Sequence, residues 1–173
     1  MKLTVYHTQA ASLQQPRTFP SLAAGYEEWL GDGYYFWQDE FFAKWWGITK
    51  KCRGWNISRR YTIYYAELEF AKDEFIDTVF NEEDYNGFVN AIERFAKKHQ
   101  KVLGRKPTLR EFNEFVSDFN LWEGVKVIRF QDIPQSNEHI QVEEFYYKKR
   151  IQIRVNDANV IKKFGELKTL ACI

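Results

Sequence analysis

The chain is poor in the residues that cross-link small domains or bind metals, and it lacks long apolar runs. Its 173 residues include two cysteines, Cys52 and Cys172, whose spacing matches no metal-binding pattern and which are too few for a disulfide framework. No stretch reaches 18 apolar residues, and the start of the chain shows no charged segment followed by an apolar core. We therefore expect no membrane span, no secretory signal and no metal, and a reducing cytoplasm is the simplest setting.

An excess of charge of either sign is also missing. The chain has 25 Lys and Arg against 24 Asp and Glu, a net charge of +1, which is too balanced for a dedicated nucleic-acid or membrane-surface protein. The length predicts a single domain over residues 1–173. Aromatic residues are abundant, at 18% of the chain. Most large rings in a compact domain pack a core, but some are expected to line a pocket for a flat ligand.

The hydrophobic pattern predicts strands towards both ends of the chain and helices between them. Strands are expected over 3–7, 34–37, 61–70, 125–130, 142–147 and 150–155. Helices are expected over 23–30, 39–50, 82–100 and 109–120. The last of these opens with Thr108 and Glu111 in the spacing of a capping box. The chain is thus of the α+β class, with a helical insertion at about 82–120.

The densest local pattern lies in residues 31–46. Gly31 and Gly33 permit a tight turn, and the aromatic residues that follow them favour a short strand. The next stretch repeats aromatic residues at helical spacing, namely Phe41, Phe42, Trp45 and Trp46. Upstream, a predicted strand ends at His7.

This order of a strand-end histidine, a glycine turn, an aromatic strand and a helix resembles the nicotinamide pocket of the ADP-ribosyltransferase superfamily. The resemblance is to its His-Tyr-Glu branch, which includes poly(ADP-ribose) polymerases and diphtheria-toxin-like enzymes, and the chain is also similar to uncharacterised bacterial domains of that superfamily. It covers residues 1–50 and, more loosely, 140–162. It implies two small facing antiparallel sheets that form a cleft, packed and inserted helices, and NAD as the substrate.

The resemblance assigns roles to individual residues. His7 matches the residue that orients a ribose hydroxyl, and Tyr35 matches the residue that stacks under the nicotinamide. Ala43 matches the small residue of the following helix, and Trp45 falls near a second stacking aromatic. Thr8 stands where many members have a glycine whose backbone holds the nicotinamide amide.

The third residue of the branch, normally a catalytic glutamate, matches Gln152 at the start of the closing strand. A glutamine keeps a carbonyl acceptor for a ribose hydroxyl but lacks the negative charge that stabilises an oxocarbenium ion. An alternative placement uses the Gln-x-Glu spacing of arginine-modifying members, which makes Glu143 the catalytic carboxylate. We prefer Gln152, because the Ile and Val residues that follow it match the closing strand better.

The resemblance therefore implies a toxin-like, NAD-dependent mono-ADP-ribosyltransferase whose acceptor is a protein or a nucleic acid. The alternative, favoured by Gln152, is a catalytically weak or inactive module that binds NAD or a related nucleotide. A third hypothesis is an interaction protein that uses its aromatic surface. The basic segment 50–60 is either a solvated loop or a contact for the NAD diphosphate or a nucleic-acid acceptor.

Overall fold

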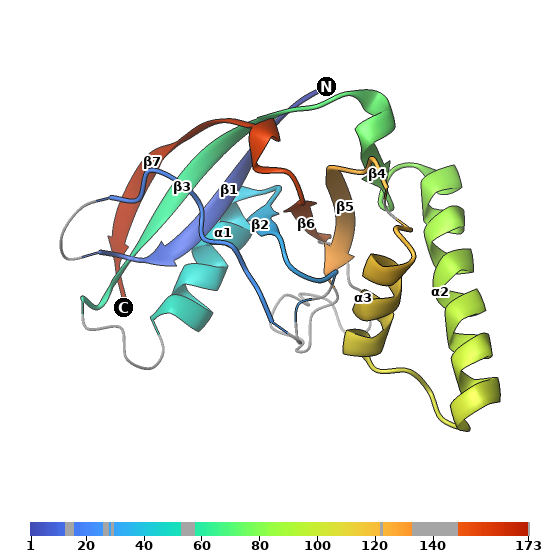
Figure 1. Ribbon diagram of the computed structural model, residues 1–173. Coiled ribbons are helices and arrows are strands. Elements are labelled where there is room, and N and C mark those ends of the chain that lie inside the picture. The colour runs from blue at the N-terminus through green and yellow to red at the C-terminus, as the bar shows by residue number, and fades with distance from the viewer. Residues whose placement is uncertain are drawn as a thin grey trace, which may run out of the picture.

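The computed structural model describes residues 1–12, 16–25, 28, 30–52, 58–121, 123–132 and 149–172 (Figure 1). Its strands are β1 (Lys2–Ala10), β2 (Tyr34–Trp37), β3 (Arg60–Glu69), β4 (Phe75–Asp77), β5 (Val127–Asp132), β6 (Arg150–Val155) and β7 (Ile161–Ala171). Its α-helices are α1 (Glu40–Trp46), α2 (Glu82–Leu103) and α3 (Leu109–Asp118). Shorter helical turns are η1 (Gly47–Lys51), η2 (Lys72–Glu74) and η3 (Ala158–Val160).

The strands form one sheet in the order β4-β5-β6-β2-β1-β3-β7. Neighbouring strands are antiparallel except β4 and β5, which are parallel. The expected α+β class is confirmed. The two facing sheets implied by the resemblance are instead one continuous sheet, because β1 stays paired with β2 where Tyr6 lies opposite Trp37.

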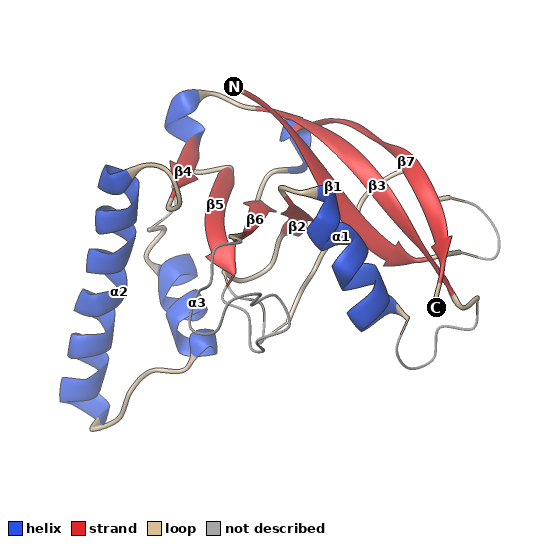
Figure 2. Cartoon of the chain, turned by 180° about the vertical axis from the view of Figure 1, so that it is seen from behind, coloured by secondary structure: helices blue, strands red, loops and turns tan. Residues whose placement is uncertain are grey.

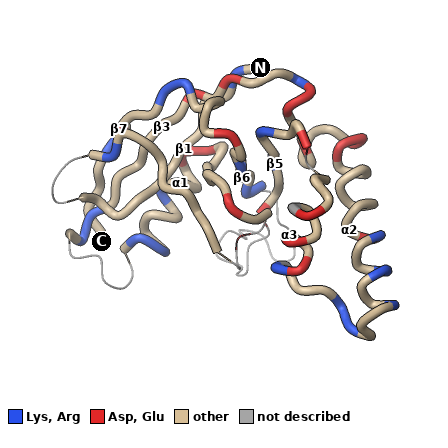
Figure 3. The backbone as a smooth tube through the Cα atoms, in the orientation of Figure 1, with Lys and Arg blue, Asp and Glu red and all other residues tan. Residues whose placement is uncertain are grey.

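The helices lie at two places along this sheet. Helix α1 lies against β1 and β3, whereas α2 and α3 lie side by side at the end formed by β4 and β5 (Figures 1 and 2). Asp39 caps α1 by accepting a hydrogen bond from the Phe41 backbone N–H, at 2.7 Å, and Asn81 caps α2 in the same way. Helix α2 begins with acidic residues and carries basic residues towards its end, which suits the helix dipole (Figure 3).

Side chains alternate between the two faces of the sheet, so β6 contributes to each face differently. Ile151, Ile153 and Val155 pack with Val5 and Phe36 in the hydrophobic core of one face. The alternate residues of β6 therefore point to the opposite face, where Trp37 packs against α1. We call these alternate residues the polar row: Arg150, Gln152 and Arg154.

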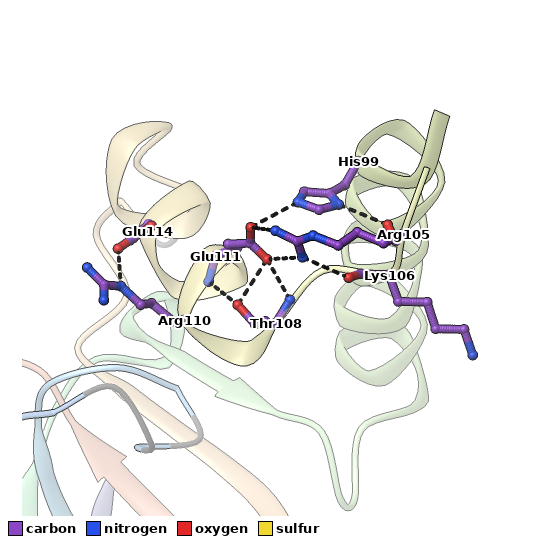
Figure 4. Close-up of polar contacts among 7 residues, drawn as sticks. All are labelled: His99, Arg105, Lys106, Thr108, Arg110, Glu111 and Glu114. Carbon is purple, nitrogen blue, oxygen red and sulfur yellow. Dashed lines mark hydrogen bonds and ion pairs between the residues drawn. The ribbon is translucent and has the colours of Figure 1, made fainter. Parts of the chain in front are cut away.

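A polar network joins the end of α2 to the start of α3 (Figure 4). The Thr108 backbone N–H donates to Glu111 Oε2 at 2.8 Å, and the Glu111 backbone N–H donates to Thr108 Oγ1 at 3.2 Å, so the predicted capping box is confirmed. His99 Nε2 lies 3.3 Å from the Glu111 carboxylate, and Arg105 donates to the same group. Hydrogen bonds from Arg105 and Thr108 hold the pKa of Glu111 well below its usual range.

Three expected elements differ from the structure or lie outside it. The described residues of 23–30 form no helix, because Ala23 instead pairs with Gly33 through two backbone hydrogen bonds of 2.9 and 3.0 Å. The helix expected over 39–50 is α-helical up to Trp46 and then continues as the wider turn η1. The strand expected over 142–147 lies outside the described residues.

The two cysteines form a disulfide between Cys52, after η1, and Cys172, after β7. Both pack against the apolar cluster that holds α1 to the sheet. Disulfides persist mainly in oxidising compartments, so this bond is at odds with the reducing setting expected from the low cysteine count. In the described part of the chain, no helix has the length and apolar character needed to span a membrane.

Candidate functional site

Strand β6, which carries the polar row, lies inside the sheet between β5 and β2, with α1 to one side and the α2–α3 pair to the other (Figure 2). Arg150 is 6% exposed, and its guanidinium stacks on Trp45, at 4.2 Å from the ring centroid, and on Trp37, at 5.6 Å. Its Nη2 donates to the carboxylate of Asp132, which lies directly opposite on β5. A buried charge needs such partners, so the two rings and Asp132 together hold this cation in the protein.

Gln152 is the middle residue of the polar row and shares a partner with Arg150. It lies between Trp37 on β2 and Phe130 on β5, and its Nε2 donates to Asp132 Oδ2 at 3.4 Å. Burial raises the pKa of Asp132, while the neighbouring Arg150 acts in the opposite direction. Sequence reasoning missed Asp132, because no pattern along the chain signals the cross-strand register that brings it to Gln152.

Arg154, the third residue of the polar row, fastens the glycine turn before β2. Its Nη2 and Nε donate to the Asp32 carbonyl at 2.8 and 3.3 Å, and burial lowers its pKa. A Cβ atom on Gly33 would lie 3.0 Å from both Cγ and Nε of Arg154. Gly33 therefore leaves the space in which the Arg154 side chain lies.

Tyr35 lies opposite Arg154 and on the same face of the sheet. Its hydroxyl donates to the Gly31 carbonyl at 2.7 Å and accepts from the Leu30 backbone N–H at 3.1 Å. Its half-buried ring meets Phe130 edge-on at 6.2 Å, and burial raises its pKa to about 12. The hydroxyl is thus neutral and holds the glycine turn in place, while the residue as a whole stays partly exposed.

A cavity of about 720 Å³ lies next to this turn. Leu30, Gly31 and Asp32 form one wall, and α3 forms another. Arg154 also lines it, while Asn113 of α3 crosses to the turn by donating to the Glu28 carbonyl at 2.9 Å. Small-molecule sites commonly have volumes of about 300 to 1,000 Å³. The cavity is thus large enough for a mononucleotide or a part of a dinucleotide.

His7 lies on the opposite face from Tyr35. Its ring contacts Phe36, with centroids 5.6 Å apart, and Phe36 and Tyr35 are consecutive residues of β2 that point to opposite faces. Burial lowers the pKa of His7 to about 4, so the ring is neutral at pH 7. Nδ1 donates to the Tyr35 carbonyl at 2.9 Å, and Nε2 accepts from the Gln9 amide at 2.6 Å. Both ring nitrogens therefore have protein partners.

The remaining predicted residues divide between the core and the polar face. Thr8 and Ala43 are buried under α1, where the Thr8 hydroxyl donates to the Ala43 carbonyl at 2.8 Å. Trp45 is half-buried over Arg150. The structure thus brings Tyr35, Trp45 and Gln152 to one face, buries Thr8 and Ala43 on the same face under α1, and leaves His7 on the other.

Two predictions cannot be compared with the structure. Glu143, the alternative third residue, and positions 53–57 of the basic segment lie outside the described residues. Lys50, at the start of that segment, lies 5.7 Å from the ring centroid of Trp46. Within the described ranges, no three His, Cys, Asp or Glu side chains are grouped so as to hold a metal ion.

Comparisons of the chain with protein-family models, with curated proteins and with solved structures find no match. Any functional assignment therefore depends on the geometry of the polar row and its surroundings.

Proposed function

We propose that this protein binds NAD or a related nucleotide through an ADP-ribosyltransferase-like arrangement, and that it holds this ligand without efficient cleavage. The observation that carries the proposal is the polar row, which places the Gln152 amide between two buried arginines on the face that also presents Tyr35 and Trp45. Arg154 joins this face to the cavity next to the glycine turn, which Tyr35, Trp45 and Gln152 do not line.

The order of the central strands supports the family resemblance at a coarse level. The neighbours β6, β2 and β1 carry Gln152, Tyr35 and His7, so the three positions that the resemblance assigns lie on consecutive strands. Tyr35 and Trp45 offer aromatic surface for a flat ring. Arg154, which lines the cavity, suits a negatively charged phosphate, and the Gln152 carbonyl suits a ribose hydroxyl.

The charges of the face favour binding over cleavage. Loss of nicotinamide from NAD leaves a positive oxocarbenium ion, which a nearby carboxylate would stabilise. Here Asp132 already neutralises Arg150, while Arg154 bonds only to a carbonyl among the contacts described. The Arg154 charge lies two strand positions from Gln152, at about 7 Å, and would oppose the cation by at most about 2 kcal/mol at an effective dielectric constant of about 20, because the nearby Asp32 carboxylate offsets part of it. That corresponds to a reaction slower by at most about 30-fold.

The contacts of His7 also favour binding over cleavage. Because both of its nitrogens are engaged by Tyr35 and Gln9, it would have to leave these partners before it could orient a ribose hydroxyl.

The test is calorimetric titration with NAD and with ADP-ribose, together with chromatographic detection of free nicotinamide. We expect binding of both, and no nicotinamide release beyond that of NAD in buffer. Gln152→Leu should weaken binding at least tenfold. Gln131→Leu, an exposed glutamine on the neighbouring strand whose side chain alternates to the other face, is the matched control and should bind like the wild type. Failure of the wild type to bind either ligand would refute the proposal.

A second candidate is mono-ADP-ribosyl transfer to a protein or nucleic acid. The observation that favours it is the Asp132 carboxylate beside Gln152, which brings a negative charge close to the position where the family has glutamate. Labelled NAD added to a lysate would then mark an acceptor with the wild type but not with Tyr35→Ala. Rapid nicotinamide release in the titrations above would favour this candidate over binding alone.

A further inference from the structure

We infer that Asp132 is a positioning residue for Gln152: it fixes the side-chain amide so that the polar face presents the carbonyl Oε1, and not the N–H group, to a ligand. The role of this orientation in ligand selection rests on the proposed function. The contact itself does not.

The cross-strand register creates the contact. On β5, Phe130 lies opposite Gln152 and Asp132 lies opposite Arg150, so the carboxylate sits diagonally beside the Gln152 side chain. Asp132 is 6% exposed and accepts hydrogen bonds from both Arg150 and Gln152. An ionised carboxylate can only accept. The amide must therefore turn Nε2 towards Asp132, and Oε1 has no hydrogen-bond partner among the residues that the structure describes.

The surroundings hold the carboxylate in this role. Arg150 is packed on Trp37 and Trp45, so its guanidinium keeps a constant position against Asp132. A flipped Gln152 would place its carbonyl oxygen against the carboxylate, where two acceptors repel each other. The fixed amide therefore selects a ligand group that donates a hydrogen bond, such as a ribose hydroxyl.

This arrangement also explains why a glutamine stands where the family has glutamate. A carboxylate at position 152 would lie within about one hydrogen-bond length of Asp132, and the two would share Arg150 as their counter-charge. Two carboxylates at such a distance do not both ionise at neutral pH. With Asp132 at this register, a neutral amide at position 152 avoids the repulsion between two carboxylates.

The test uses Asp132→Asn and two measurements. In the first, the side-chain amide signals of Gln152 are followed by NMR and assigned from their loss in Gln152→Leu. In the second, NAD affinity is measured by calorimetry. The amide that replaces the carboxylate can offer Gln152 either an oxygen or an N–H group. We therefore expect the Gln152 signals to shift towards those of a free amide and NAD affinity to fall about fivefold to tenfold.

The chain supplies a matched control on the other face of β5. Asp77 and Arg129 form an equally buried ion pair at 2.7 Å, and Arg129 also stacks on two rings, those of Phe75 and Phe80. Asp77→Asn should lower stability as Asp132→Asn does, yet leave the Gln152 signals and NAD affinity unchanged. If Asp132→Asn proves too unstable to purify, Asp132→Asn combined with Arg150→Gln removes both charges and takes its place.

Each outcome has a defined meaning. Unchanged Gln152 signals in the Asp132 variant overturn the inference, whatever happens to NAD. Altered signals with unchanged NAD affinity overturn the claim that orientation selects the ligand. If the wild type binds no NAD but the signals change as expected, the positioning role stands and the proposed function fails.

Discussion

The disulfide between Cys52 and Cys172 provides a strong test of how this fold is held together. The two residues are 120 positions apart, so the bond closes most of the chain into a loop. The chain-entropy relation for a loop of this size gives about 16 cal/mol/K, or about 5 kcal/mol at 25 °C, of stabilisation through the unfolded state. We expect reduction, or the double variant Cys52→Ser/Cys172→Ser, to lower the free energy of unfolding by about this amount.

The same value predicts a large change in melting temperature. A chain of 173 residues unfolds with an entropy of about 360 cal/mol/K, so a loss of about 5 kcal/mol lowers Tm by about 14 °C. The assay is thermal unfolding by calorimetry, with and without a thiol reductant. After reduction, the loss of structure should begin near α1, because both cysteines pack on the cluster that holds this helix to the sheet.

The double serine variant is also the control, since a reductant should leave its Tm unchanged. A shift of less than about 2 °C on reduction of the wild type would refute the entropic argument. Alkylation of two free thiols in protein purified under oxidising conditions would refute the pairing itself.

Three further predictions concern single residues. Because burial lowers the pKa of His7 from 6.5 to about 4, the unfolded state binds more protons between these values, and stability should fall by about 3 kcal/mol as the pH drops through this window. His7→Gln should flatten that part of a urea-unfolding pH profile, and an unchanged slope would contradict the burial argument. A Cβ on Gly47 would lie 2.2 Å from the Tyr61 ring, so Gly47→Ala should cost about 1 to 3 kcal/mol in urea unfolding, whereas Gly87→Ala, which meets open space, should not destabilise. Thr108→Ala removes the cap shared with Glu111 and should cost about 1 kcal/mol, while Thr108→Ser should restore most of it.

Much of the secondary structure could be predicted from local patterns. The strand over 34–37, the long helix from residue 82 and the capping box at Thr108 follow from signals that lie within a few residues of one another. The edge strands β4 and β7 lack such signals, because β4 has three residues and half-exposed β7 has no clean alternation. The pattern over 23–30 predicts a helix that the described residues of this segment do not form, because Ala23 pairs with Gly33, which lies beyond the segment.

The candidate site was predicted less well, for a related reason. The resemblance selected Tyr35, Trp45 and Gln152, and the structure places these three residues on one face. The face on which His7 lies depends on the register between β1 and β2. The hydrogen-bond partners of its two ring nitrogens are the Tyr35 carbonyl and the Gln9 amide. No local pattern indicates Asp132 or Arg150, because their interaction arises only when they lie opposite each other on two strands.

By itself the sequence determined the α+β class, the aromatic turn and strand after Gly31, and the helical pair, because propensity, capping and alternation act over short distances. Tertiary structure decided the contacts of the Gly31–Gly33 turn: Gly33 leaves space for the Arg154 side chain, and the Gly31 carbonyl accepts a hydrogen bond from the Tyr35 hydroxyl. It also decided that Cys52 meets Cys172 and that Gln152 meets a carboxylate. These contacts join residues far apart in the chain, and only the packing of the whole sheet brings them within reach.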